Sequence, residues 1–581
     1  MNSENNAPPA HELYSRHVDG TDGSRIAPRL WGPIPSTMGD AYKLLVKKRE
    51  DYGPAHGELE ELKKAMKDNL RRLGILTSRV TDGIDRLERG VIETGQQPMC
   101  LGGPSLVLNK IAYIHSLSNL GDEGFTPLFY VADYDGVQPE LLNIRLPSPS
   151  SRGLVLSYPM GQGMENAPIY RLGNPPEDWL RETLERIEGN LKGVLGGVGI
   201  EAQSSALRNL AHASTVLKST YYSTENVSEW STKILGTVVN LEASLGVPMY
   251  AFSMQGTRHL FQGGYELLLG EPNRSRFIKA SNEACELVET SGFRSGIGLR
   301  EKDYVPFFLE CPNPGCNGAR VELKYRRSEG SPNASVSGRC AKCGETHKHS
   351  FNAGSPDLTE MIGYINPRVD SRQVIVDSVI PVLAHVGGPG ETSYYAEVIP
   401  AAEAIGIPFP VYLRYTRTFY NTPWNEAQAT RLKDSGHSTL ADSDLFSSLG
   451  KWVEARNSSD VEGLRQAHEG IKTSIEGTFN ELLKRLGAIQ SDVEAIKARL
   501  REPGDRGPLI KKMREKQVEA KDIEQYLSTA FGRFSPEKFG QEVNWAWLDL
   551  VAVSGIRDLM GVYLREYNGN TPNSSMFYVN L

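Results

Sequence analysis

The sequence predicts an α/β protein with a Rossmann-like parallel sheet core, a helical connective region, an inserted zinc ribbon and a C-terminal antiparallel coiled coil. Two segments, 91–135 and 379–415, each run in the order strand, glycine turn, helix, strand, and parallel strands need such a crossover helix. Four cysteines between residues 311 and 343 have the spacing of metal ligands. Residues 475–500 carry apolar side chains in alternating steps of four and three, the seam of a coiled coil.

A chain of 581 residues is long enough for several folding units around a large core. We expect seven segments along it: an N-terminal helical segment (1–88), the first half of the Rossmann-like core (89–170), a mainly helical connective region (171–300), the zinc ribbon (301–356), the second half of the core (357–425), the antiparallel coiled-coil hairpin (426–535) and a C-terminal helix and tail (536–581).

Charge and cysteine content narrow the class of protein. The formal net charge of −7 argues against the global basic field of a dedicated nucleic-acid-binding protein, so we expect no nucleic-acid partner. The first forty residues hold no apolar stretch of signal-peptide length, and no apolar run reaches spanning length. Six cysteines do not make a disulfide framework. We therefore expect a cytoplasmic protein with free thiols and no membrane partner.

The N-terminal part precedes the first strand of the core. Residues 1–40 are polar and rich in proline, and we expect a loose segment there. Residues 58–87 alternate charged stretches with Leu and Ile, a pattern that predicts one or two amphipathic helices packed on the sheet.

The first half of the core begins with a short strand over 91–97, which contains Gly95, Gln96 and Gln97. Gly102 and Gly103 follow in a tight turn. A helix then extends to about residue 120, and a buried strand spans 126–135.

The helical period of residues 176–290 predicts a connective region. One strand candidate, 247–254, interrupts it and would help to complete the sheet.

The second half of the core is the stretch around which the chain is organised. A strand over 379–386 leads into Gly387, Gly388 and Gly390, and a helix follows from Glu391 to about residue 403. A second strand spans 409–415. The glycines let the backbone approach a ligand closely, while the helix points its unpaired N–H groups and positive dipole end at the same place. The alternative is a turn that is tight only because two elements pack closely.

The four cysteines predict a structural zinc site. Cys311 and Cys316 are separated by four residues, and Cys340 and Cys343 by two, with a β-like run between the pairs. Two such loops place four thiolates around one zinc ion, and this ligand set leaves no open position for catalysis. With four cysteines present, we expect the neighbouring histidines, His347 and His349, to be solvated or to lie outside the ligand set.

The C-terminal part predicts a helical hairpin and a core helix. The seam consists of apolar residues spaced by four and three: Ile475, Phe479, Leu482, Leu486, Ile489, Val493, Ile496 and Leu500. Two prolines and two glycines in 501–508 end the helix, and a weaker apolar stripe returns after them. The basic residues near that turn are interpreted as a solvated helix face rather than a nucleic-acid contact. The apolar stretch 545–556 predicts a core helix.

Charged residues near the two glycine turns suggest the chemistry. Two positive helix ends facing one ligand would suit a phosphate or a di-acid. Asp133 and Asp135 end a predicted strand, and either could hold a substrate ammonium group or remove its proton; the alternative is that one of them caps the turn. Lys110 and Arg414 could supply counter-charge. No His or Asn has the spacing from Cys100 that would indicate a partner in thiol catalysis, so we interpret Cys100 as a packing residue.

These motifs resemble a known family. The strings ETGQQ, GGP and FYVADYD, followed by AHVGGPGETSYYAE and GIPFPVYLR, resemble the cysteine-adding enzymes of bacillithiol biosynthesis, the BshC family. The resemblance implies a ligase that joins the carboxyl of cysteine to the amine of a glucosaminyl-malate acceptor, with carboxyl activation by ATP, and a homodimer. It also implies that Gly95, Gln96, Gln97, Asn143, Glu391 and Tyr394 belong to the substrate or nucleotide site.

One departure from the family keeps other functions open. The family has a Glu-Asp-His-Asp string after this strand, whereas here Gly136 stands where the His would be. Either another residue performs the role of the His, or this chain acts on a different substrate. The zinc ribbon also looks like an insertion. The alternatives are a class I aminoacyl-tRNA-synthetase-like protein, although its signature strings are missing, and a non-catalytic relative of the ligase.

Overall fold

The core of the protein is a five-stranded parallel sheet. The computed structural model describes residues 7–18, 20, 25–52, 57–150, 153–254, 256–440, 449–452, 454–455, 458, 460–503, 506–531, 540–573 and 576–581. The sheet order is β13-β12-β1-β2-β5, with every pairing parallel. The strands are β1 (Val91–Gln96), β2 (Thr126–Val131), β5 (Met249–Ala251), β12 (Val382–Gly387) and β13 (Val411–Arg414). The predicted α/β class with a Rossmann-like core is confirmed.

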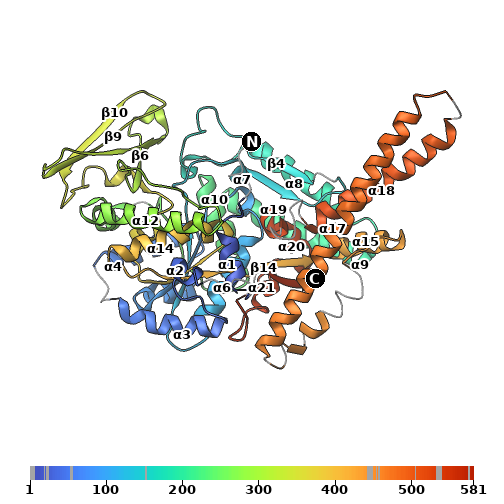
Figure 1. The fold of residues 1–581 in the computed structure, drawn as a ribbon, viewed down its shortest axis with the longest axis horizontal. Helices are drawn as coiled ribbons and strands as arrows, with labels where there is room; N and C mark the ends of the chain where they lie inside the picture. Colours follow the sequence, from blue (N-terminus) through green and yellow to red (C-terminus); the bar gives the residue numbers. More distant parts are fainter. Residues whose placement is uncertain are drawn as a thin grey trace.

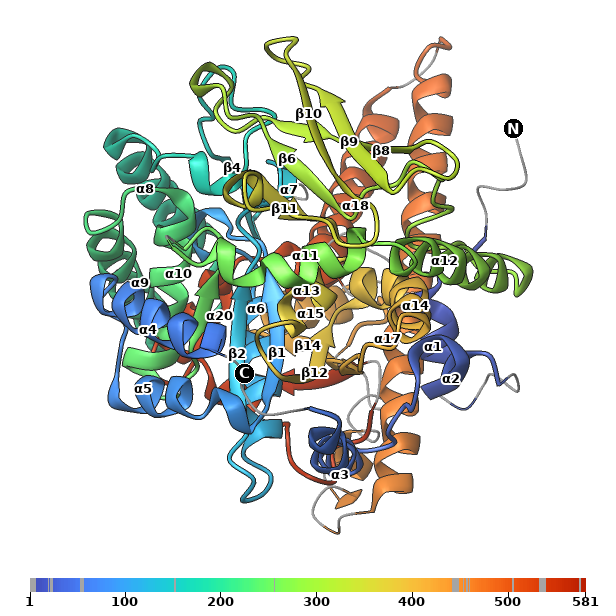
Figure 2. The same ribbon diagram turned by 90° about the vertical axis from the view of Figure 1, so that its left-hand side faces the viewer.

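The sheet has a topological switch point between β1 and β12. The chain first builds outward from β1 through β2 to β5, and it later builds outward in the other direction from β12 to β13. Ile92 pairs with Ala384 on one side and with Pro127 on the other, so β1 is central (Figure 2). Crevices at such switch points, outside the carboxyl ends of the strands, are where sheets of this kind bind ligands.

Helices cover the sheet on both halves. The helix α6 (Leu106–Ser118) packs against β1, β2 and β12, and α14 (Pro389–Ala404) packs against β12 and β13. The short helix α13 (Arg372–Asp377) leads into β12. The predicted strand over 126–135 ends earlier, at Val131, because the chain turns at Asp133.

The expectation of a loose segment over residues 1–40 is wrong for its described part. That part forms α1 (His11–Val18) and α2 (Ala27–Trp31) and enters α3 (Met38–Lys48), which is followed by α4 (Gly57–Arg72) and α5 (Ser78–Asp85). Tyr14 and Trp31 are buried. The Trp31 indole N–H donates to the carbonyl of Thr392, 2.9 Å away. A few large apolar side chains therefore hold a stretch whose overall composition is polar.

The connective region is mainly helical, as predicted. A two-stranded hairpin precedes it, made of β3 (Asn143–Leu146) and β4 (Leu154–Ser157). The short helix α7 (Pro139–Leu142) lies just before this hairpin. The helices of the connective region are α8 (Glu177–Val194), α9 (Ile200–Tyr221), α10 (Val227–Gly236), α11 (Gln262–Leu269) and α12 (Asn273–Thr290). Its strand β5 completes one edge of the sheet.

The cysteine-bearing segment forms two small antiparallel sheets (Figure 1). The inner sheet has the order β11-β6-β7 and the outer sheet the order β10-β9-β8. The strands are β6 (Phe307–Glu310), β7 (Arg320–Glu322), β8 (Lys324–Arg327), β9 (Asn333–Arg339), β10 (Thr346–Asn352) and β11 (Ile365–Pro367).

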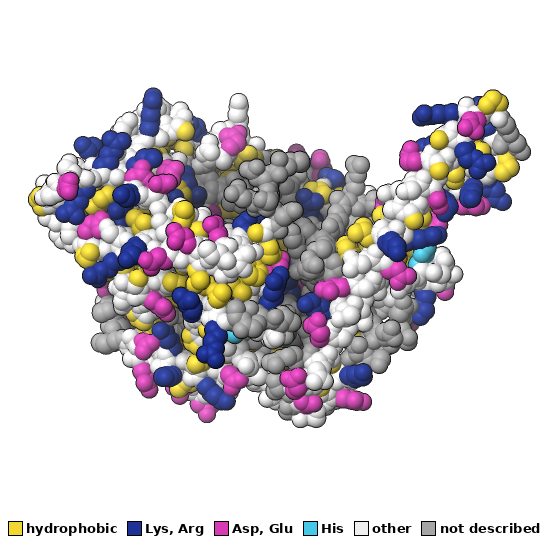
Figure 3. All heavy atoms as spheres, viewed as in Figure 1, with side chains coloured by type: hydrophobic (Ala, Val, Ile, Leu, Met, Phe, Trp, Pro, Cys, Tyr) yellow, Lys and Arg dark blue, Asp and Glu magenta, His cyan; other side chains and the backbone are white. Residues whose placement is uncertain are grey.

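A long helical hairpin projects from the body, as Figure 1 shows. Its arms are α17 (Val461–Arg499) and α18 (Gly507–Phe531), and α15 (Pro423–Asp434) packs on α18. Six of the eight residues of the predicted seam are buried, with Ile475 and Ile489 at 0% exposure, and Phe479 and Leu500 are partly buried. Lys516 pairs with Asp492 at 2.7 Å, and Figure 3 shows both charge signs at the far end of the hairpin. This mixed surface fits a solvated helix face.

The last part of the chain returns to the core. It contains α19 (Gly540–Asn544), α20 (Trp547–Ser554), α21 (Gly561–Leu564) and β15 (Met576–Asn580), which pairs in parallel with β14 (Arg417–Asn421). Trp545 and Trp547 are each 1% exposed, so the predicted core helix is confirmed. Within the described ranges, the search for a helix both long and apolar enough to cross a bilayer finds none.

Short single-turn segments link these elements. They are η2 (Arg49–Asp51), η3 (Leu87–Arg89), η4 (Cys100–Gly102), η5 (Ile169–Arg171), η6 (Thr237–Glu242), η7 (Arg258–Phe261), η8 (Pro314–Cys316) and η9 (Ile362–Tyr364).

Candidate active site

A cavity of about 370 Å³ opens at the switch point, at the carboxyl ends of β1 and β12. Nine residues proposed from the sequence line it: Gly95, Gln96, Gln97, Lys110, Asp135, Gly388, Gly390, Glu391 and Tyr394. They come from segments about 290 residues apart in the chain and meet because β1 and β12 are neighbours in the sheet. This cavity is the candidate active site.

The first glycine turn lies away from the cavity. A Cβ on Gly102 would lie 2.9 Å from Trp547 Nε1, and one on Gly103 would lie 2.8 Å from Met99 Sδ. Both residues have φ near +80°, a backbone conformation that glycine adopts without strain. Here the close approach is to other side chains, so the first turn is tight because of packing.

Three other proposed residues also lie outside the cavity lining. Gly387 ends β12, and a Cβ there would lie 2.6 Å from Tyr412 Oη. Asn143 begins β3 and accepts a hydrogen bond from Ser157 Oγ, 2.7 Å away. Arg414 ends β13 and donates to Ser15 of α1.

Asp133 is a buried anchor of the loop after β2. Its side chain is fully buried and accepts hydrogen bonds from Ser228 Oγ at 2.7 Å and from the Ser253 backbone N–H at 3.0 Å. Burial raises the pKa of its carboxyl, and the hydrogen bonds from Ser253 and Ser228 oppose that rise. Asp133 thus holds the connective region against the sheet, facing away from the cavity.

Asp135 reaches the cavity. It accepts a hydrogen bond from the Gln97 amide at 3.0 Å and lies 3.4 Å from a guanidinium nitrogen of Arg320. Its side chain keeps 28% of its surface exposed. Burial raises the pKa of Asp135, while Arg320 and Gln97 partly offset the rise. A carboxylate that is reachable and has a raised pKa is suited to accept a proton from a substrate.

Lys110 and Glu391 form an ion pair inside the cavity wall. Lys110 Nζ lies 2.5 Å from Glu391 Oε2 and donates to the carbonyl of Gly95 at 2.9 Å. The backbone N–H of Gly388 also donates to Glu391 Oε2, at 2.7 Å. Burial would raise the pKa of Glu391, but Lys110 and His385 hold it below its usual range. The pair therefore fixes the start of α14 to α6 and to the end of β1.

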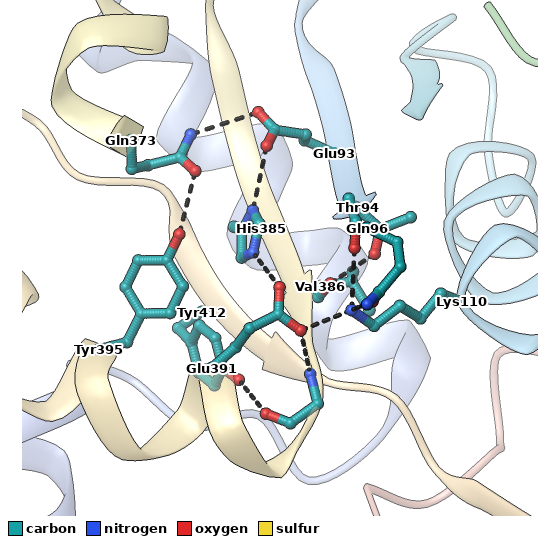
Figure 4. A network of polar contacts seen from close by, with 12 residues as sticks. Glu93, Thr94, Gln96, Lys110, Gln373, His385, Val386, Glu391, Tyr395 and Tyr412 are labelled. Atoms are coloured by element: carbon teal, nitrogen blue, oxygen red, sulfur yellow. Dashed lines mark hydrogen bonds and ion pairs between the residues drawn. The ribbon is translucent and has the colours of Figure 1, made fainter. Parts of the chain in front are cut away.

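His385 continues this network into the sheet (Figure 4). Its two ring nitrogens each lie 3.3 Å from a carboxylate oxygen, Nε2 from Glu391 and Nδ1 from Glu93. Arg372 donates to Glu93 at 2.7 Å and to Tyr395 Oη at 2.7 Å. Burial would raise the pKa of Glu93, but Arg372 and His385 lower it to about 2. Polar contacts between buried side chains therefore lead from the cavity wall through β12 to β1.

Sequence reasoning missed this buried network and part of the cavity wall. Arg372, Tyr134, Tyr415 and Arg417 line the cavity and were not proposed. A signal existed for His385, because it is an ionisable residue inside an otherwise apolar strand. Glu93 lies on the strand 91–97, which was predicted to run parallel to it. No comparable pattern marks the cavity-lining residues outside the strands.

The four cysteines meet as predicted. Their sulfur atoms all lie within 4.8 Å of one another. Cys311 Sγ is 3.7 Å from Cys343 Sγ, and Cys316 Sγ is 3.8 Å from Cys340 Sγ. His347 Nε2 lies 3.5 Å from Cys311 Sγ, outside the four-sulfur set. The cluster can bind a metal ion.

Cys100 is buried, and burial raises the pKa of its thiol. A thiol of this kind is a poor nucleophile. This agrees with its interpretation as a packing residue.

Comparison with known proteins finds no matching family model. Three curated bacterial relatives match, each named as a candidate cysteine ligase BshC. The protein from Desulforamulus reducens is 24% identical over 71% of this chain and 70% of its own length. The protein from Carboxydothermus hydrogenoformans is 22% identical over 72% of each chain. A third, from Chloroherpeton thalassium, is 24% identical over 25% of each chain.

By these matches the chain is similar to the BshC proteins. Gly136 stands where the sequence resemblance implies a His. A Cβ built on Gly136 meets no atom within 4 Å. The backbone there has room for a larger side chain, so tight packing does not explain the glycine.

Proposed function

We propose that the chain is a ligase that joins the carboxyl of cysteine to the amine of an anionic amino sugar of the glucosaminyl-malate type, as in the synthesis of bacillithiol-type thiols. The observation that carries this proposal is the match to relatives named for cysteine ligation over about 70% of the chain. The cavity supports it, since it gathers residues of both motif regions at the switch point.

The charge of the cavity suits an anionic acceptor. Its lining carries three cationic side chains, Lys110, Arg372 and Arg417, against two carboxylates, Asp135 and Glu391. The amino end of α14 adds a partial positive charge beside Gly388 and Gly390. We assign the acceptor's carboxylates to this end of the cavity.

Asp135 would then act as the general base. The acceptor nitrogen attacks the activated cysteine carboxyl carbon, a carbon–nitrogen bond forms, and the leaving group departs with its electron pair. Asp135 takes the proton released by the nitrogen. Because the base must be ionised, we expect the rate to fall at acidic pH, with a midpoint above the usual pKa of an aspartate.

ATP as the source of carboxyl activation, and a homodimeric assembly, are further parts of this proposal. Both rest on the family resemblance.

We further propose that the cysteine cluster binds one structural zinc ion. A tetrahedron with zinc–sulfur bonds of about 2.3 Å has sulfur–sulfur edges of about 3.8 Å, close to the distances in the two pairs. Cys311, Cys316, Cys340 and Cys343 would hold the ion, and it would stabilise the ribbon without taking part in bond formation.

The deciding experiment measures amide product by mass spectrometry from cysteine, ATP and glucosaminyl-malate. We expect product with the wild type and a rate lower by about 100- to 10,000-fold for Asp135→Asn, the usual cost of losing a general base. Asp133→Asn is the matched control. We expect it to lower the unfolding temperature and to leave the rate of amide formation by the folded protein nearly unchanged. Equal rates for wild type and Asp135→Asn would remove Asp135 from the mechanism. A folded wild type that makes no product would overturn the proposed substrates.

A further inference from the structure

The cysteine-bearing ribbon borders the candidate active site through Arg320. This residue begins β7, on the inner sheet of the ribbon, and a guanidinium nitrogen lies 3.4 Å from Asp135 Oδ1. The guanidinium also stacks over the ring of Phe308 on β6, with 4.4 Å between Arg320 Cζ and the ring centroid. Its backbone N–H donates to the carbonyl of Asn166 at 3.3 Å. The ribbon thus places a cation directly against the candidate base.

Hydrogen bonds connect the loop of Cys311 and Cys316 to the residues at the start of β7. Its preceding residue, Ala319, accepts a hydrogen bond from the Cys311 N–H at 2.9 Å and donates one to the Cys316 carbonyl at 3.0 Å. Arg320 also pairs with Glu310, the residue before Cys311, in the antiparallel ladder of β6 and β7. A metal that binds both cysteines would close this short loop and fix the start of β7.

A second contact connects the same loop to Asp135. Glu310 is 2% exposed and accepts a hydrogen bond from Arg258 at 2.8 Å and another from the hydroxyl of Tyr170. The backbone N–H of Tyr170 donates to the Asp133 carbonyl at 3.1 Å, and that of Ile169 donates to the Asp135 carbonyl at 2.9 Å. Two residues flank the cysteine loop. Glu310 is linked through Tyr170 to the backbone of the segment 133–135, and Arg320 contacts the side chain of Asp135 in the same segment.

Other charged or titratable groups also face Asp135. They are Arg372 on α13, Tyr394 on α14 and Tyr134 in the same loop. Arg372 is engaged with Glu93 and Tyr395. Arg320 is the cation that touches Asp135, so its loss would change the charge around this carboxylate most directly.

We propose that Arg320 is a positioning residue for Asp135, and that metal binding by the ribbon acts on the active-site cavity through Arg320. The catalytic meaning of this coupling rests on the proposed ligase function, whereas the coupling itself does not. The ribbon then does more than stabilise the fold, because it contributes one of the charged groups that set the protonation state of Asp135.

The test follows Asp135 without using activity. Carbodiimide labelling of carboxyl groups requires the protonated acid, so the pH midpoint of labelling at Asp135, read by peptide mass spectrometry, reports its pKa. Removing a neighbouring cation should raise that midpoint by about one pH unit in Arg320→Ala. Arg320→Lys keeps the charge and should show a smaller rise. Arg326→Ala, an exposed arginine on the outer sheet of the same ribbon, is the control and should leave the midpoint unchanged.

The metal half of the proposal is tested on the full chain with Cys340→Ser and with chelator-treated wild type. Both should raise the labelling midpoint of Asp135 in the same direction, and the double variant Arg320→Ala, Cys340→Ser should shift it no further than Arg320→Ala alone. An unchanged midpoint in Arg320→Ala, or fully additive shifts in the double variant, would overturn the proposal. Failure of the ligase assay with a clear midpoint shift would count against the proposed substrates and leave the coupling intact.

Discussion

Gly388 lies close to the ring of Tyr415 in the cavity wall. Its φ of −99° suits any residue, but a Cβ there would lie 3.1 Å from Tyr415 Cε1. Gly388 and Tyr415 both line the cavity. The role of this glycine is therefore spatial, and a larger side chain would occupy part of the space available to a ligand.

We predict that Gly388→Val weakens binding of glucosaminyl-malate at least tenfold while the unfolding temperature changes little. Isothermal titration calorimetry measures the first quantity and differential scanning fluorimetry the second. The control is Gly363→Val, an exposed position with no atom within 4 Å of the added Cβ. Wild-type affinity in Gly388→Val would remove the turn before α14 from the ligand site.

The different roles of the two aspartates after β2 could not be predicted from the sequence. Asp133 and Asp135 are two residues apart, and the sequence offers the same chemistry for both. Their roles separate because Ser228 and Ser253, each about 100 residues further along, turn Asp133 inward. Such partners are fixed by tertiary packing, and no local pattern encodes them.

Among the elements, the hairpin depends on its apolar seam. Leu486 is 9% exposed and belongs to the cluster that joins α17 to α18. A charge placed there without a partner would cost several kcal/mol. Three residues earlier, Leu483 is 49% exposed on the outer side of the same helix.

We predict that Leu486→Asp lowers the free energy of unfolding of the hairpin by several kcal/mol and makes its two arms, α17 and α18, more susceptible to proteolysis. Leu483→Asp, the same substitution three residues earlier, should leave both properties nearly unchanged. Limited proteolysis with mass mapping gives the comparison. Equal resistance of the two variants would show that the seam does not hold the arms together.

For the ribbon, we predict about one tightly held zinc per chain in the purified protein, measured by elemental mass spectrometry. Cys340→Ser should lose the metal and loosen the local fold, because a structural zinc contributes directly to folding. Cys285→Ser is the control, a buried cysteine outside the cluster. Zinc-free wild type in reducing buffer would contradict the proposed site.

Elements with a strong period or a fixed ligand spacing were predicted well from the sequence. The a/d seam predicted the first arm of the hairpin, a weaker apolar stripe predicted the second, and the cysteine spacing predicted the cluster. Residues 11–31 were not predicted, since α1 and α2 are short and the large side chains that hold them, Tyr14 and Trp31, stand in a polar context. Their order comes from contacts with α14 and β13, which are not visible locally.

Over the whole molecule, Glu542 joins the C-terminal part to β14 and α6. It is buried on α19 and accepts hydrogen bonds from the Thr418 backbone N–H at 2.7 Å and the Asn109 amide at 3.0 Å. Burial raises the pKa of Glu542 to about 8 despite these bonds. In the unfolded chain the group would titrate near 4.3. Between these values the folded state keeps a proton that the unfolded state loses, so this group makes stability fall as pH rises.

We predict that Glu542→Gln, which keeps an uncharged group in place, makes the pH dependence of stability shallower between pH 5 and pH 8. Over this window, the free energy of unfolding of the wild type should fall by up to about 1.4 kcal/mol per pH unit more than that of Glu542→Gln. Thermal unfolding in matched buffers measures the difference, with Glu481→Gln on the exposed side of α17 as control. Parallel pH curves for wild type and Glu542→Gln would show that Glu542 is ionised in the folded protein.

The central pairing of β1 with β12 has a consequence for how the protein is made. Val91 pairs with Val382, so one side of β1 lacks its neighbour until nearly 300 further residues have left the ribosome. At about 5–20 residues per second, that interval lasts roughly 15–60 s. An apolar strand with an open edge invites pairing with other chains during this time. We therefore expect yield in cells to depend on translation rate and chaperone supply more strongly than the stability of the finished protein would suggest.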